Sequence, residues 1–124
     1  MILGFHSINM ALRFILEIAA LIAMGYWGWL KGVGVLSYAL AFGIPLLAAT
    51  LWGVFAVPHD PSRSGKAPIP IPGLLRLALE LAIFAFATWA LFDLGSLITG
   101  WMLCIIVTIH YLVSFERSIW LWKN

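Results

Sequence analysis

The stretch Leu12-Arg13-Phe14-Ile15-Leu16-Glu17-Ile18-Ala19 recurs as Leu75-Arg76-Leu77-Ala78-Leu79-Glu80-Leu81-Ala82. Each copy places an Arg and a Glu four residues apart in an otherwise apolar segment. Both charges shift by the same 63 positions, from 13 to 76 and from 17 to 80. Side chains at this spacing lie on one face of a helix. The repeat therefore predicts two similar helices that carry matched charge pairs.

The rest of the chain has the composition of an integral membrane protein. Of its 124 residues, 64% are hydrophobic and 10% are charged, whereas a soluble domain has about 25% charged residues. The mean hydropathy is +1.06. A chain of this length has room for about four spans of roughly 20 residues each. We therefore expect an all-α membrane protein with a single transmembrane domain over residues 1–124.

Four apolar segments predict four spans, at about residues 10–29, 35–57, 73–92 and 97–117. Asn9 is the expected N-cap of the first span. Residues 58–72 form the predicted Pro-rich loop, whose alternating Pro and Ile favour an extended strip, and Pro72 suits the first position of the third helix. Pro45 should free the Ala41 carbonyl and bend the second helix. That bend is either a packing kink, or a hinge or polar-ligand site.

The basic residues predict the orientation of the four spans. Only Lys31 lies on one side of the membrane, and six basic residues lie on the other: Arg13, Arg63, Lys66, Arg76, Arg117 and Lys123. By the positive-inside rule, both termini and the Pro-rich loop are cytoplasmic. The net charge of +2 is explained by this topology, so we expect no nucleic-acid partner.

The repeat also predicts symmetry between the two halves of the chain. Each half contains one copy of the repeat and two spans, so the two halves have the same orientation in the membrane. A pseudo-twofold axis would run along the membrane normal, which makes the fold a 2+2 pseudo-repeat of four transmembrane helices. Such an axis would let Arg13 meet Glu80 while Arg76 meets Glu17. Glu116 and Arg117, at the cytoplasmic end of the fourth span, would extend the same network.

Two interpretations of these intramembrane charges stay open. An unpaired charge at the centre of a membrane helix costs roughly 2.5–3.5 kcal/mol, so pairing or protonation is expected. The charges are then either a structural salt-bridge network that fixes helix register, or a site where Glu17 or Glu80 carries protons or binds a cation. Binding of a lipid headgroup is a third reading.

His110 lies in the fourth span, where the sequence places it close to mid-membrane. An intramembrane His is a candidate ligand or proton relay, although Thr50, Thr108 or backbone carbonyls would satisfy it equally well. The chain has no P-loop, GxGxxG, CxxC, HExxH or GxSxG motif. We therefore expect no enzymatic activity, no metal site and no cofactor.

Three short stretches carry a family resemblance: residues 12–17, Trp52-Gly53-Val54-Phe55-Ala56-Val57-Pro58, and residues 76–81. Together they resemble the YrdB-like family of small uncharacterised bacterial four-helix membrane proteins. The resemblance implies four spans and a bacterial cytoplasmic (inner) membrane. It also implies that five positions recur in the family pattern: Glu17, Trp52, Gly53, Pro58 and Glu80. The fourth span matches least, so His110 has no support from the family.

Small multidrug exporters offer a second, weaker resemblance, since they have a similar length and a membrane-embedded Glu in the first helix. They work as antiparallel dimers, and the six-to-one charge bias and the second Arg/Glu copy depart from that pattern. We therefore expect a structural or interaction protein, as a homo-oligomer or an accessory subunit among other membrane subunits in the lipid bilayer. The alternative is a small proton- or cation-coupled transporter that uses Glu17 and Glu80.

Overall fold

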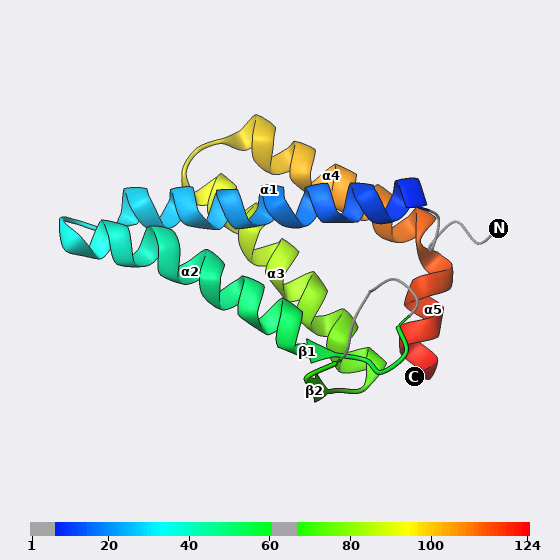
Figure 1. Cartoon of the computed structure of the whole chain (residues 1–124). Helices are drawn as coiled ribbons and strands as arrows, with labels where there is room; N and C mark the ends of the chain where they lie inside the picture. The colour runs from blue at the N-terminus through cyan, green and yellow to red at the C-terminus, as the bar shows by residue number, and fades with distance from the viewer. Residues whose placement is uncertain (1–6, 61–66) are drawn as a thin grey trace.

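The computed structural model of the chain describes residues 7–60 and 67–124. Within them lie five helices and two short strands (Figure 1), in the order α1 (Ser7–Lys31), α2 (Val35–Val54), β1 (Phe55–Ala56), β2 (Ile69–Pro70), α3 (Gly73–Asp93), α4 (Leu97–Val113) and α5 (Phe115–Lys123). Residues 1–6 and 61–66 lie outside the described residues. Arg63 and Lys66 of the predicted cytoplasmic loop belong to the second of these segments.

Helices α1, α2 and α3 are each long and apolar enough to cross a membrane. Helices α4 and α5 make a fourth candidate only as one broken span, since they meet at an angle of 69°. The expectation of a helical protein with several segments long and apolar enough to cross a membrane is thus confirmed. The predicted span over residues 97–117 is not one continuous helix, because the backbone leaves the helical conformation at Ser114, with φ −92° and ψ 28°.

Helices α1 and α2 form a hairpin whose backbones approach closely at glycines of α1. A Cβ added to Gly28 would lie 2.7 Å from the Leu40 carbonyl oxygen, and one on Gly25 would lie 2.9 Å from the Ala41 oxygen. Small residues allow this approach, which is typical of helix pairs in membranes. Gly25 therefore faces the Ala41 carbonyl, which is the one that Pro45 frees. Helix α2 continues through Pro45 as one helix.

The segment after α2 differs from its expected form. Helix α2 ends at Val54, three residues before the end of the predicted span over residues 35–57. Phe55–Ala56 instead pairs in parallel with Ile69–Pro70, which confirms the extended strip of alternating Pro and Ile. Pro72 is the N-cap residue of α3 and not its first helical residue. Two-residue strands add little stability, but their pairing fixes where the chain re-enters at α3.

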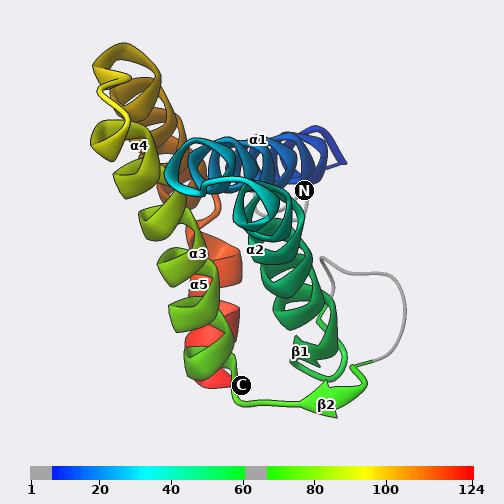
Figure 2. The same cartoon turned by 90° about the vertical axis from the view of Figure 1, so that its left-hand side faces the viewer.

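The apolar core lies where α1, α3 and α4 meet, and Phe84 and Met24 are among its largest buried side chains. Helix α2 packs mainly on α1 and buries only two residues, Ser37 and Ala48. Figure 2 shows α1 lying across the upper end of α2, with α3 at its side. The hairpins α1/α2 and α3/α4 follow the expected chain order, and a twofold relation between them stays a prediction.

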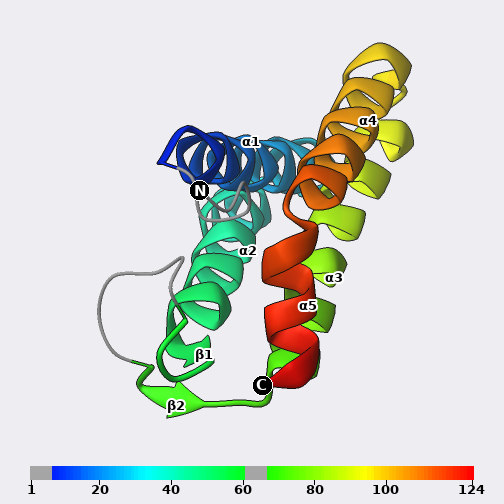
Figure 3. The ribbon, with the colours of Figure 1, turned by 90° about the vertical axis from the view of Figure 1, so that its right-hand side faces the viewer.

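Helix α5 turns back along the first half of α3, as Figure 3 shows. The contact is close because Gly73 opens α3 without a side chain: a Cβ there would collide with the Leu121 carbonyl group. Leu121 is fully buried in this contact. The segment that follows Ser114 is therefore a helix that completes the packing around the start of α3.

Candidate functional site

Glu80 on α3 is the centre of a buried charge network. Its side chain is 0% exposed. Its Oε2 accepts hydrogen bonds from Arg13 at 3.0 Å, Arg76 at 2.7 Å and Arg117 at 2.8 Å. Its Oε1 accepts from Tyr111 at 2.8 Å and again from Arg117 at 2.9 Å. The carboxylate thus joins side chains from α1, α3, α4 and α5, and its acceptor sites are filled.

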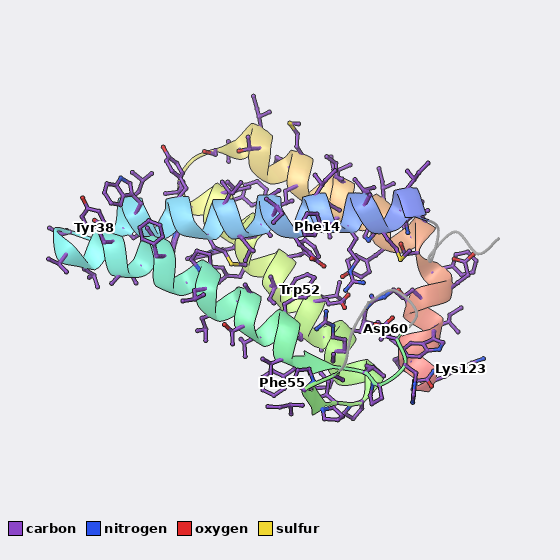
Figure 4. The ribbon with its side chains drawn as sticks, in the orientation of Figure 1. Phe14, Tyr38, Trp52, Phe55, Asp60 and Lys123 are labelled. Atoms are coloured by element: carbon purple, nitrogen blue, oxygen red, sulfur yellow. The ribbon has the colours of Figure 1, made fainter. Side chains whose placement is uncertain are left out.

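Arg117 connects this network to the loop that follows α2. Its Nη2 donates to Asp60 Oδ2 at 3.0 Å as well as to Glu80. Both Arg117 and Asp60 are buried, at 3% and 6% exposure, and Asp60 is labelled in Figure 4 beside the C-terminal helix. A buried guanidinium that meets two carboxylates is well compensated. The break at Ser114 is what turns Arg117 toward α3.

Arg76 closes the C-terminal end of α2. Besides its bond to Glu80, its Nη1 donates to the backbone carbonyls of Trp52, at 2.5 Å, and Phe55, at 2.7 Å. The last carbonyls of a helix lack partners within the helix, and a cation at that end also suits the helix dipole. Arg76 therefore links the end of α2 to α3.

The ring of Trp52 lies against two of these cations. The guanidinium carbons of Arg76 and Arg13 are 5.4 Å and 5.9 Å from the ring centroid, and Phe84 meets the ring edge to face at 5.4 Å. Such cation–π contacts are favourable in a desolvated site. Two further residues of the expected motif, Gly53 and Pro58, are exposed, whereas the Trp52 ring packs against the network.

Glu17 lies at the rim of the network. Its Oε1 is 3.3 Å from Arg13 Nε, and its side chain is 21% exposed, against 0% for Glu80. The crossed pairing expected from the repeat is therefore present on one side only. Arg13 meets Glu80, whereas Arg76 bonds Glu80 of its own helix. Glu116 is half-buried in the first turn of α5, next to Arg117 in the chain.

His110 belongs to a small polar cluster near the C-terminal end of α4, and its depth in a membrane stays a prediction. Its Nδ1 is 3.1 Å from Asn9 Oδ1, and Asn9 Nδ2 donates to Ser114 Oγ at 2.6 Å. Asn9 is thus inside α1 rather than its N-cap, and it satisfies His110 in place of Thr50 and Thr108. The hydroxyls of these two threonines bond carbonyls of their own helices. The His110 side chain is 2% exposed.

A second polar cluster joins the C-terminal ends of α1 and α3, away from the Glu80 network. Asp93 Oδ2 accepts from Trp27 Nε1 at 2.8 Å and pairs with Lys31 Nζ at 2.9 Å. Sequence reasoning did not identify Asp93, nor did it identify Asp60, Tyr111 or Asn9 as partners of the expected residues. Asp93 directly follows the third apolar segment and Asp60 lies three residues after the second predicted span, so a systematic search for carboxylates near predicted helix ends would have found both.

Within residues 7–60 and 67–124, no three His, Cys, Asp or Glu side chains gather in a way that could hold a metal ion. The Glu80 carboxylate lies among guanidinium groups, which leave no acceptor free for a cation. This arrangement can hold helices together and orient them. Of the two carboxylates in the repeat, only Glu17 is partly exposed and could exchange a proton or bind a ligand.

Comparison with known proteins supports the resemblance inferred from the repeat and the tryptophan motif. Residues 11–108 match the family model described as Protein of unknown function (DUF2568). The chain is 46% identical over 117 residues to "Uncharacterized protein YrdB" of Bacillus subtilis (strain 168), and the match covers 94% of both chains. No solved structure matches the chain. The chain therefore belongs to the DUF2568 family, which includes YrdB-like proteins.

Proposed function

We propose that the chain is a structural or interaction protein of the bacterial cytoplasmic membrane, in which the Glu80 network holds four helices in a fixed arrangement. The observation that carries this proposal is the saturation of Glu80. A fully buried carboxylate with five hydrogen bonds from four side chains has no free acceptor for a passing proton or cation. Removal of one partner from such a cluster is strongly destabilising.

The membrane arrangement is part of the proposal. Helices α1, α2, α3 and α4 each cross the bilayer, and both termini and the loop between β1 and β2 lie in the cytoplasm. Helix α4 has 17 residues, which is about 25 Å at the usual helical rise and just long enough for a span. Helix α5 then lies along the cytoplasmic interface, where exposed Trp122 and Lys123 suit the headgroup region.

Helix α2 supports an interaction role. It buries only two residues, and large apolar side chains such as Phe42, Leu46 and Leu47 are more than half exposed. Helices in membranes associate through packing against such surfaces. We propose that the chain works as a homo-oligomer or as an accessory subunit of a larger membrane complex, without catalytic activity of its own.

Two measurements test the proposal. Gentle purification followed by mass spectrometry of the intact complex should show a homo-oligomer or a bound membrane subunit; a lone monomer would overturn the interaction role. In proteoliposomes with an imposed pH gradient, the protein should move no more protons than empty liposomes do. A proton flux that disappears in Glu17→Gln or Glu80→Gln would favour the transporter instead.

A further inference from the structure

A recess of about 180 Å³ lies between α1 and α2 and has not been assigned a role. Its lining is apolar except for one carboxylate, Glu17, and it includes two aromatic rings, Phe14 and Trp52. Figure 4 labels these two aromatic residues on α1 and α2. The remaining lining residues are Ile18, Leu21, Ala49 and Gly53. An acidic group in an apolar recess is a site for a small cation with apolar parts.

Glu17 has acceptor capacity that Glu80 lacks. Its one ion pair in the described residues is with Arg13 at 3.3 Å, and Arg13 is shared with Glu80 at 3.0 Å. A carboxylate offers about four lone-pair sites, so Glu17 can accept further N–H donors. Arg76 and Arg117 are turned toward Glu80, backbone carbonyls and Asp60, and neither forms an ion pair with Glu17 in the described residues.

The position of the recess favours a ligand from the membrane interface. Trp52 and Gly53 belong to the last turn of α2, which ends at Val54. At about 1.5 Å of rise per residue they lie within about 3 Å of the end of the helix. If α2 spans the bilayer, as proposed above, the recess opens near the boundary between hydrocarbon and headgroups. Phe14 at its edge is 62% exposed and would contact acyl chains.

We propose that this recess binds the primary ammonium group of an amphiphile, with the Glu17 carboxylate as the hydrogen-bond acceptor. A primary ammonium has three N–H donors, whereas a trimethylammonium has none to give. A metal ion such as Mg²⁺ or Ca²⁺ needs several oxygen ligands, and the recess lining supplies one carboxylate. The ammonium comes from phosphatidylethanolamine or from a free long-chain amine, and the apolar remainder of either lies in the bilayer.

The test compares ammonium and trimethylammonium probes that are otherwise alike. The purified full-length protein in mild detergent is mixed with equal amounts of phosphatidylethanolamine and phosphatidylcholine with the same acyl chains, and bound lipid is counted by mass spectrometry of the intact protein. A parallel sample compares dodecylamine with dodecyltrimethylammonium. Because a hydrogen bond to a charged group contributes roughly 1.5–3 kcal/mol, the preference for the primary ammonium should be about tenfold or more.

Two variants and two controls locate the site. Glu17→Gln removes the charge, and Gly53→Leu fills the recess while keeping Glu17; a Cβ at Gly53 meets no atom within 4 Å, so the fold tolerates it. Both should lose the preference. Gly43→Leu is the matched control, since a Cβ there also meets nothing within 4 Å and Gly43 does not line the recess. Glu116→Gln controls for loss of an acidic residue elsewhere.

The outcomes are distinct. A preference in the lipid pair identifies phosphatidylethanolamine, and a preference in the dodecyl pair alone identifies a free amine. Equal binding within both pairs, or a preference that survives in both Glu17→Gln and Gly53→Leu, would overturn the proposal. The inference rests on the proposed bilayer placement of α2 and not on the role of Glu80. Failure of the Glu80 network is measured separately, by the thermal stability of Glu80→Gln.

Discussion

Arg117 on α5 and Glu80 on α3 form a bidentate pair, with Nη1 2.9 Å from Oε1 and Nη2 2.8 Å from Oε2. The two side chains are 37 positions apart in the chain and almost fully buried. A planar guanidinium matched to a carboxylate in this way has geometric specificity as well as charge. The C-terminal helix is therefore held to the centre of the fold, and it is not a loose tail.

Replacement of Arg117 should destabilise the protein strongly. Arg117→Ala leaves Glu80 and Asp60 short of a buried partner and should lower the free energy of unfolding by about 3–5 kcal/mol. Arg117→Lys keeps a charge but loses the fork geometry, and it should cost less. Unfolding of the purified protein in detergent measures both. Lys123→Ala, at an exposed position of the same helix, is the control and should stay within about 0.5 kcal/mol of the parent.

Exchange of the charges at positions 13 and 80 should fail to restore stability. In Arg13→Glu with Glu80→Arg, the new Arg at position 80 would face Arg76 and Arg117, which now bond Glu80. The number of guanidinium groups would not change, but a cation would replace the carboxylate that Arg76 and Arg117 share. The doubly exchanged protein should express no better than the worse single variant. Recovery to the parent level would mean that Arg13 and Glu80 act as an isolated pair.

The glycine contacts between α1 and α2 predict a difference between two substitutions. Gly28→Leu would push α2 away from α1, because a Cβ at Gly28 would already lie 2.7 Å from the backbone of Leu40. Gly43→Leu meets open space on α2. The melting temperature of Gly28→Leu should fall by several degrees, whereas Gly43→Leu should leave it unchanged or raise it. Equal melting temperatures would contradict the close contact.

The polar cluster of Asp93, Lys31 and Trp27 should contribute less to stability than the Glu80 network does. Asp93→Asn weakens its contacts with Lys31 and Trp27, but the Asp93 and Lys31 side chains are 30% and 45% exposed. Exposed ion pairs contribute little and are screened by salt. The melting temperature of Asp93→Asn should therefore stay near that of the parent, and far above that of Glu80→Gln. An equal loss in the two variants would contradict a network centred on Glu80.

The proposed orientation predicts which exposed sites a reagent outside the cell can reach. In a Cys104→Ser background, Val33→Cys and Trp122→Cys place a thiol at positions that are 85% and 70% exposed. A membrane-impermeant maleimide should label position 33 in intact cells and position 122 only after the membrane is opened. The reverse pattern would invert the topology. Labelling of both sites in intact cells would place them on the same side.

Several features of the fold follow from short-range sequence pattern. Apolar length predicted the helices, the Pro and Ile alternation predicted an extended strip, and the repeat brought Arg13 to Glu80. The family also followed from short motifs, because Trp52 and the two Arg/Glu stretches are local. These predictions succeed because helical rise and side-chain spacing depend on residues only a few positions apart.

The sequence by itself therefore determined a helical chain with several segments apolar enough to cross a membrane and with Arg paired to Glu among them. Only the tertiary structure decided which Glu is saturated. The break at Ser114 turns Arg117 toward α3, and Arg76 is divided between Glu80 and the end of α2. Asp60 and Tyr111 complete the cluster from positions without any periodic signal. The physical reason is that a buried charge must find all its partners in space. Arg76 is four positions from Glu80, but Tyr111, Arg117 and Arg13 are 31, 37 and 67 positions away, and Asp60 is 57 from Arg117. These longer separations are beyond the reach of helical periodicity.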